Sequence, residues 1–233
     1  MYRATATRAV GIDAVNFYMR GVYGWMTLGL GVTALCAWAT VSTPEVMQLI
    51  FGNALVLIGL IFAQFALVMA LGSAMHRFSA GTATFMFMLY SVLNGLTLSS
   101  IFVVYSQASI VQAFVTASGM FGAMSIYGAT TKKDLTSWGS FLMMGVFGLI
   151  IASLVNIFLK SSAMEFVISG VGVLLFTGLT AYDTQKLRAF GAGTPMDDPA
   201  AVRRGTLLGA LTLYLDFINL FLMLLRLFGG RRD

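Results

Sequence analysis

Long apolar runs separated by short polar segments dominate the chain. An α-helix needs about 20 consecutive apolar residues to cross the hydrocarbon core of a bilayer, and the charge-poor intervals of this sequence reach that length. The predicted fold class is therefore an all-α polytopic membrane protein with seven transmembrane helices. These helices are predicted at about residues 21–42, 49–73, 80–104, 109–130, 138–159, 165–187 and 205–227.

The boundary between the third and fourth predicted helices rests on one polar segment. No charged residue occurs between Phe78 and Thr131, so only the stretch YSQAS at residues 105–109 separates the two helices. The whole arrangement predicts a single membrane domain with short tails. The predicted parts are an N-terminal tail at 1–20, a seven-helix domain at 21–229 and a C-terminal tail at 230–233.

Composition supports a lipid environment. Hydrophobic residues make up 58% of the 233 residues, charged residues make up 10%, and the mean hydropathy is +0.88, which excludes an ordinary water-soluble domain. The first apolar run is long enough to remain in the membrane, and charged residues precede it, so it is predicted to be an uncleaved anchor. Short tails without an organelle-targeting feature favour a bacterial inner membrane. The single cysteine, Cys36, excludes an internal disulfide.

Positive charge predicts the orientation, because short loops rich in lysine and arginine stay in the cytoplasm. With the N-terminus in the cytoplasm, that side collects ten of the fourteen basic residues. We therefore expect anionic lipid at the cytoplasmic face as a partner. Nucleic acid is not expected, because no soluble basic module is present. The ten residues are Arg3, Arg8, Arg20, Arg77, Lys132, Lys133, Lys186, Arg188, Arg203 and Arg204.

The last apolar segment allows two interpretations. A full span places Arg226, Arg231 and Arg232 outside, against the charge rule, and a re-entrant hairpin would avoid this conflict. A span is favoured because about 23 residues lie between the flanking arginines without a central proline or glycine pair.

Two acidic residues, Asp183 and Asp216, fall inside predicted membrane helices, whereas the other seven lie in tails or loops. A carboxylate near the bilayer centre costs several kcal/mol unless it faces protein or water. The sixth and seventh helices are consecutive and antiparallel, so the two carboxyl groups meet if the sixth helix continues toward Phe190 or the seventh begins late. The alternative for Asp183 is that it snorkels to the interface beside Lys186.

Two carboxyl groups in contact would have a defined chemistry. Burial and mutual repulsion both disfavour two charges, so the pair is expected to keep at least one proton near neutral pH and to titrate as a unit. When deprotonated, its oxygens are ligands suited to Ca²⁺. A zinc site lacks ligands, because the chain has one histidine and one cysteine. No tightly bound cofactor is expected.

Three strings, LTAYDTQKL at 179–187, LTLYLDFINLFLMLLRLFG at 211–229 and NGLTLSSIF at 94–102, resemble the Bax inhibitor-1 (transmembrane Bax inhibitor motif) family. The likeness covers nearly the whole chain. It implies six helices wrapped around a central seventh, a pH-sensitive di-aspartyl unit at Asp183 and Asp216, and a calcium-leak activity.

The resemblance also implies further site residues. Family members use an arginine of the second helix to latch onto the aspartate of the sixth, and Arg77 is the best-placed candidate here. Polar residues within the matching strings are expected to support the site by hydrogen bonds to neighbouring helices. These are Tyr182, Tyr214, Asn219 and Asn94.

Two other functions were weighed. An intramembrane aspartyl protease also uses two aspartates on consecutive helices, but it places Gly-x-Gly before the second aspartate and a Pro-Ala-Leu further on. This chain has LYLD there, and its only prolines are Pro44, Pro195 and Pro199, so enzymatic activity is not expected. The other alternative is a regulatory protein that binds a membrane-anchored AAA protease of the FtsH type through the tail at 1–20.

Overall fold

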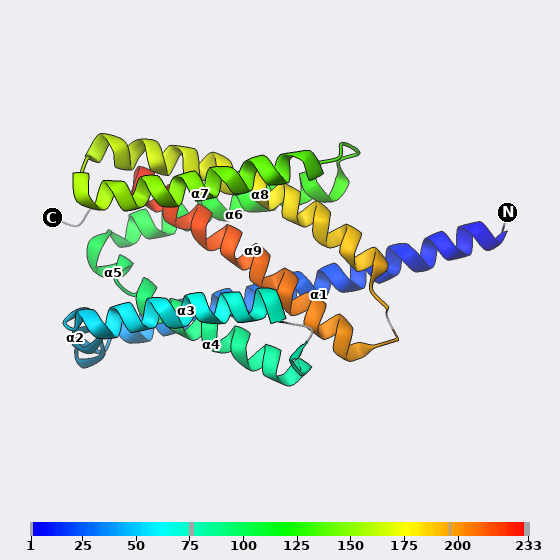
Figure 1. Ribbon diagram of the computed structural model, residues 1–233, viewed down its shortest axis with the longest axis horizontal. Coiled ribbons are helices and arrows are strands. Elements are labelled where there is room, and N and C mark those ends of the chain that lie inside the picture. The colour runs from blue at the N-terminus through cyan, green and yellow to red at the C-terminus, as the bar shows by residue number, and fades with distance from the viewer. Residues whose placement is uncertain (1, 75–76, 196, 231–233) are drawn as a thin grey trace. The chain divides into compact units, whose positions relative to one another are not determined.

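The computed structural model describes residues 2–74, 77–195 and 197–230, and the side chains of residues 2–12 and Ala74 lie outside this description. Within these ranges the chain is helical and contains no strand. Seven of the described helices are long and apolar enough to cross a membrane (Figure 1). The prediction of an all-α polytopic membrane protein is confirmed.

The helices follow the predicted spans closely, although α2 and α5 are short additional elements. The elements are α1 (Tyr2–Val41), α2 (Pro44–Phe51), α3 (Ala54–Ala74), α4 (Ala80–Leu98), α5 (Ile101–Val104), α6 (Gln107–Thr130), α7 (Thr136–Leu159), α8 (Ser162–Gly193) and α9 (Pro199–Phe228). The candidate spans lie in α1, α3, α4 with α5, α6, α7, α8 and α9. Because α1 begins at Tyr2, residues 2–20 are helical and continuous with the first span. The protease-partner hypothesis invokes the tail at 1–20, in which the side chains of residues 2–12 lie outside the described residues.

Local polar groups explain where the helices break. The second span begins at Ala54 because α2 ends at Phe51 with Gly52 as its C-cap, and Asn53 Oδ1 accepts the Leu55 N–H at 3.0 Å. Serine side chains compete with the helical ladder at the end of α4, where Ser99 Oγ donates to the Leu96 carbonyl at 2.7 Å. These interruptions leave seven spans but change their limits.

The predicted boundary between the third and fourth spans is confirmed. Ser106 caps α6, and its Oγ accepts the Ser109 N–H at 3.2 Å. A side-chain acceptor at this position satisfies a backbone donor that has no partner within the helix. The polar segment at 105–109 therefore starts a new helix.

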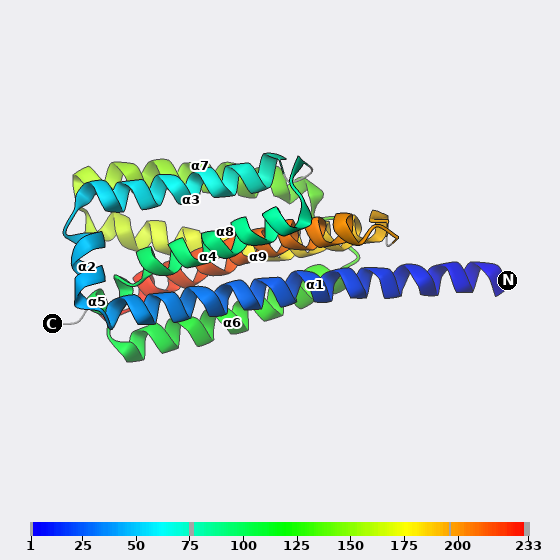
Figure 2. The ribbon, with the colours of Figure 1, turned by 90° about the horizontal axis from the view of Figure 1, so that it is seen from below.

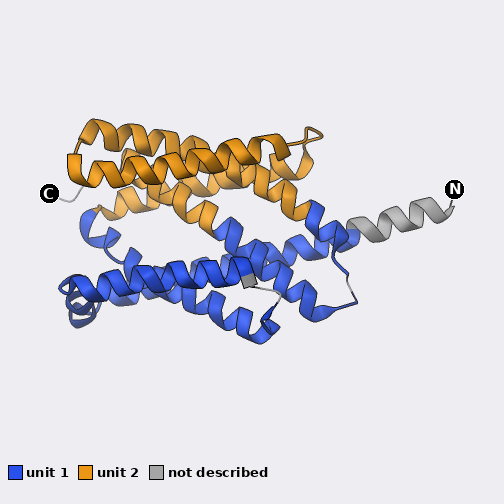
Figure 3. Cartoon of the chain, in the orientation of Figure 1, with its two compact units in different colours: residues 1–104, 189–214 blue, residues 105–188, 215–233 orange. Residues whose placement is uncertain are grey.

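The chain divides into two compact units, which Figure 3 colours separately. The boundaries fall after Val104, Arg188 and Tyr214, so α8 and α9 each contribute to both units.

The unit that contains α1 to α5 is built around α4, which packs against α1 and α3. The short α2 lies across the ends of α1 and α3 (Figure 2). Close approach of α1 and α4 depends on glycines, since a Cβ on Gly29 would lie 2.7 Å from the Phe87 ring and one on Gly95 would lie 2.6 Å from Cys36 Cβ.

The other unit places α8 against α6 and α7. Gly128 of α6 faces the backbone of Ala181 so closely that a side chain has no room, and Gly145 of α7 meets Leu175 of α8. The C-terminal half of α9 packs on α6, where the Phe217 ring stands edge-on to Phe114 and Phe121, with centroids 5.6 Å away in each case. Small residues and aromatic edges thus hold this unit together.

The α9 helix is the most buried span. Within the apolar window of each helix, 72% of the α9 residues are buried, compared with 44% for α8 and 6% for α3. The central position that the family resemblance implies for the last helix stays a prediction. The α9 helix is also continuous over 30 residues, so the re-entrant hairpin is excluded.

Large apolar side chains on the outer faces have lipid as their natural solvent. Leu55 is 80% exposed and Phe158 is 85% exposed, and many other large hydrophobic residues of α3 and α7 are also exposed. Exposure on this scale is rare in a soluble monomer and ordinary for a helix in a bilayer.

The orientation remains a prediction, and thiol labelling tests it. We expect a cysteine introduced at Lys160 to react with an impermeant maleimide added outside the cell, and one at Lys133 to stay unmodified. Both positions are exposed, and Cys36→Ala supplies the thiol-free background. Labelling at 133 but not at 160 would reverse the orientation.

Candidate functional site

The side chains of Asp183 on α8 and Asp216 on α9 lie close enough for the two carboxyl groups to interact, and a hydrogen bond between them stays a prediction. Only 9% of Asp183 and 5% of Asp216 is exposed, and both belong to the same unit. A hydrogen bond between two carboxyl groups requires a proton on one of them, and two buried carboxylates at this range would repel each other. The burial of Asp183 beside Asp216 favours the pair over the snorkelling alternative.

The length of α8 explains how the two groups reach the same level. The helix continues to Gly193, six residues beyond the predicted end at 187. Asp183 therefore lies ten residues before the helix end, or about 15 Å from it at 1.5 Å per residue. This continuation toward Phe190 was one of the two conditions under which the sequence predicts the contact.

A cation lies beside the pair. Lys186 follows Asp183 by one helical turn and attracts its charge, while the Lys186 Nζ lies 5.7 Å from the centroid of the Tyr182 ring. The Tyr182 ring in turn fills the space left by Gly139 on α7. Tyr182 thus holds the lysine next to the acidic pair.

Three buried polar atoms in this unit have no hydrogen-bond partner among the described residues. They are Ser125 Oγ on α6, Thr184 Oγ1 on α8 and Asp216 Oδ2 on α9. Buried polar atoms are nearly always satisfied by protein, water or an ion. Sequence reasoning missed Ser125 and Thr184. The position of Thr184 directly after Asp183 was a usable signal, but Ser125 stands in an ordinary apolar run.

One glutamine fixes the segment between α6 and α7 to α8. Gln185 Nε2 donates to the Lys133 carbonyl at 2.8 Å, and Gln185 Oε1 accepts the Leu135 N–H at 2.9 Å. Asp134 lies between Lys133 and Leu135. Hydrogen bonds from Thr136 hold the pKa of the Asp134 carboxyl below its ordinary value, so Asp134 is charged at neutral pH. The loop is thereby anchored two residues from Asp183.

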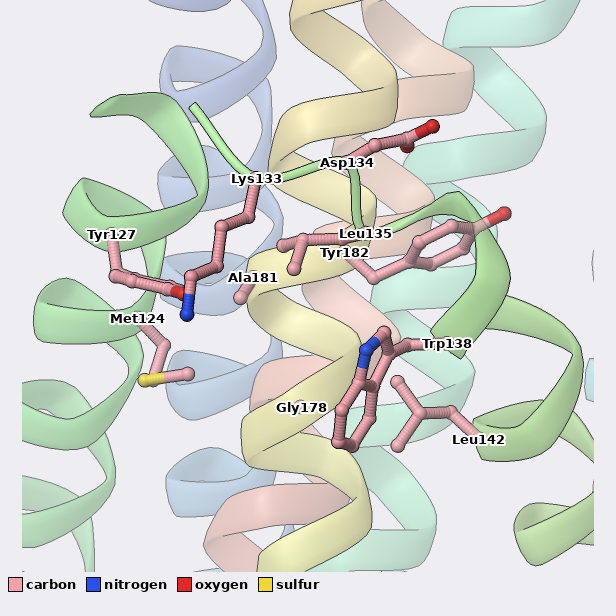
Figure 4. A pocket seen from close by; sticks show the side chains of 10 residues that line it. All are labelled: Met124, Tyr127, Lys133, Asp134, Leu135, Trp138, Leu142, Gly178, Ala181 and Tyr182. Carbon is pink, nitrogen blue, oxygen red and sulfur yellow. The ribbon is translucent and has the colours of Figure 1, made fainter. Parts of the chain in front are cut away.

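A cavity of about 350 Å³ lies beneath this loop (Figure 4). The Lys133 side chain reaches into it toward Tyr127, whereas the Asp134 carboxylate points away. Gly178 and Ala181 of α8 leave space along one wall. The complete lining is Met124, Tyr127, Lys133, Asp134, Leu135, Trp138, Leu142, Gly178, Ala181 and Tyr182. Since Ala181 and Tyr182 precede Asp183, the cavity and the acidic pair share one stretch of α8.

The other predicted polar residues lie elsewhere. Tyr214 belongs to the first unit, where its hydroxyl is 2.6 Å from Thr33 Oγ1. Asn94 donates from Nδ2 to the Tyr90 hydroxyl of its own helix at 3.2 Å, so its expected bond to a neighbouring helix stays a prediction. Asn219 likewise donates to the Leu215 carbonyl of its own helix at 2.8 Å.

The Arg77 latch and the calcium contact stay predictions. Arg77 is exposed and belongs to the first unit, whereas the acidic pair belongs to the second. The described residues contain no group of three or more His, Cys, Asp or Glu side chains arranged to hold a metal. Because Ca²⁺ takes six to eight oxygen ligands, the pair would supply only part of its shell, and water or carbonyl groups would supply the rest.

Comparison with known proteins identifies the family. Residues 15–233 match the family described as "Inhibitor of apoptosis-promoting Bax1". The chain is 56% identical over 215 residues to the inner membrane protein YbhL of Escherichia coli (strain K12), and this match covers 92% of each chain. It is 47% identical over 218 residues to an uncharacterized protein of Borreliella burgdorferi, which covers 94% of each. The chain therefore belongs to the Bax inhibitor-1 family.

Proposed function

We propose that this protein is a pH-sensitive calcium-leak protein of the bacterial inner membrane, gated by the Asp183–Asp216 pair. The observation that carries the proposal is the contact between two buried carboxyl groups on consecutive membrane helices. Ionisable groups are rare inside membrane spans, and those that occur usually serve ion or proton movement.

The pair is suited to gating because its charge changes by a full unit with one proton. With one proton shared, the carboxyl groups hold α8 and α9 together by a hydrogen bond. Loss of that proton leaves two negative charges in a poorly solvated site, which favours either separation of the helices or entry of a cation. The nearby Lys186 stabilises one negative charge on Asp183 but not two.

Unsatisfied polar atoms support a hydrated route beside the pair. Ser125 Oγ, Thr184 Oγ1 and Asp216 Oδ2 come from three helices of one unit, and each lacks a protein partner among the described residues. Water molecules bound to these atoms would offer a permeating Ca²⁺ the oxygen ligands that it needs.

The relatives support the proposed location. The Escherichia coli relative is named an inner membrane protein, and the match to it extends over nearly the whole of both chains. Seven apolar spans and exposed large hydrophobic side chains suit a lipid bilayer.

Calcium flux into dye-loaded proteoliposomes tests the proposal. The reconstituted protein is expected to admit Ca²⁺ faster than protein-free vesicles do, at a rate that changes between about pH 6 and about pH 8. Asp13→Asn removes an exposed acid outside the pair and serves as the matched control. Flux no greater than that of empty vesicles at any pH would reject the proposal.

A further inference from the structure

A second concave site lies in the first unit, between α1 and the N-terminal turns of α9. This groove encloses about 820 Å³. Its floor is the close contact of the two helices, since a Cβ on Gly21 would lie 2.8 Å from Thr206 Cγ2. The lining residues are Phe17, Arg20, Gly21, Trp25, Pro199, Val202, Arg203 and Thr206.

The groove is cationic and aromatic. Arg20 of α1 and Arg203 of α9 both line it, although they are far apart in the sequence, and both side chains are exposed. The guanidinium carbon of Arg203 lies 5.4 Å from the centroid of the Trp25 ring. No acidic residue occurs among the described residues that line the groove.

Asp198, the acid directly before α9, is already engaged. Asp198 Oδ1 accepts the N–H groups of Ala200 and Ala201 at 2.9 and 3.0 Å, so it caps the helix. The same bonds occupy backbone donors of the first turn. The attraction of the groove for an anion therefore comes from the two guanidinium groups.

We propose that this groove binds the headgroup of an anionic phospholipid. Guanidinium groups bind phosphate through paired hydrogen bonds, and two of them compensate a lipid that carries a net negative charge. Tryptophan and other aromatic residues prefer the level of the lipid headgroups, and Phe17, 64% exposed, offers apolar surface to the start of an acyl chain. The sequence predicts that the first span begins at about residue 21, which would put Arg20 near the membrane boundary. This site does not depend on the proposed calcium leak.

Fluorescence quenching by brominated lipid tests the groove directly. Trp38→Phe and Trp138→Phe leave Trp25 as the sole tryptophan, and both replaced side chains are exposed, at 64% and 59%. In mixed vesicles, quenching of Trp25 by each brominated lipid reports how strongly that lipid binds beside it. The relative affinity, phosphatidylglycerol over phosphatidylcholine, is expected to be raised roughly five-fold by each arginine. Arg20→Gln with Arg203→Gln should reduce this relative affinity to about one. Because the relative affinity is a ratio of two measurements on the same variant, any direct effect of Arg203 on Trp25 emission cancels.

The control removes the same charge elsewhere on the predicted cytoplasmic side. Lys132→Gln with Arg188→Gln lies outside the groove and should keep the lipid preference. Arg20→Gln alone, on an exposed side chain, should lower the preference by about five-fold and is informative even if the double variant does not fold. Added inorganic phosphate should not displace the lipid. Equal quenching by the two lipids, an unchanged preference in the arginine variants, or displacement by free phosphate would each overturn the assignment.

Discussion

Asp216→Asn is expected to flatten the pH dependence of Ca²⁺ flux between about pH 6 and about pH 8. Asparagine keeps the size and the hydrogen-bonding capacity of a protonated aspartic acid but cannot lose a proton. A change of one charge in a poorly solvated site shifts a two-state equilibrium by one to a few kcal/mol, which is about ten-fold or more in the open population. The variant should therefore lose about a ten-fold change in flux across this range.

Asp183→Asn should flatten the profile as well and should also change the basal flux. This carboxyl group contacts both Asp216 and the charge of Lys186, so its loss frees a cation. The Arg77 latch, if present, would be freed in the same way. Asp13→Asn should leave the flux and its pH profile unchanged. If both pair variants kept the wild-type flux and profile, the pair would be structural and the gating mechanism would be refuted.

Gly128→Leu is expected to disrupt the packing of α6 on α8. The nearest atoms to a Cβ at this position are the backbone oxygen, carbonyl carbon and Cα of Ala181, which cannot move aside as a side chain can. Overpacking of this kind lowers the free energy of unfolding by about 1–3 kcal/mol. Gly128→Ala should fall in this range, and Gly128→Leu should exceed it. For a chain of this size, each kcal/mol lowers the apparent Tm by roughly 2–4 °C. Thermal unfolding of the detergent-solubilised protein measures the effect.

The same helix supplies the matched control. Gly122 has no atom within 4 Å of an added Cβ, so Gly122→Ala should leave the apparent Tm unchanged or raise it. Because Ala181 lies two residues before Asp183, Gly128→Ala should also alter the flux profile. An equal Tm for Gly128→Leu and the wild type would show that α6 and α8 do not approach closely in the membrane.

Hydropathy was sufficient to predict the seven spans, because a bilayer demands a minimum apolar length whatever the fold. It could not predict the breaks within the third span. The break after Leu98 depends on which acceptor the hydroxyl of Ser99 reaches. The extension of α8 to Gly193 was left open, since Lys186 and Arg188 interrupt the apolar run and the glycines at 191 and 193 are weak helix formers.

The acidic pair was recognisable because acids are rare in membrane spans: four of the nine fall in the candidate spans, and two of these, Asp13 and Glu165, stand at span ends. The contacts that support it could not be predicted from one sequence. The double hydrogen bond of Gln185 to the loop and the unsatisfied hydroxyl of Ser125 depend on how α6 and α8 are rotated against each other. The hydrophobic periodicity of the sequence does not predict that rotation, so the roles of these residues could be identified only from the structure.

The shared proton is the central claim, and infrared spectroscopy of the carboxyl C=O stretch tests it most directly. Titration of the reconstituted wild type should show a protonated buried carboxyl at neutral pH, with a band that disappears as the pair loses its proton. The band should be absent at neutral pH in Asp216→Asn, because Lys186 stabilises the remaining charge on Asp183. In Asp183→Asn it should shift in frequency, because Asp216 stays buried but loses its carboxyl partner. A wild-type spectrum without any protonated carboxyl at neutral pH, or a band that persists unchanged in both variants, would contradict the account.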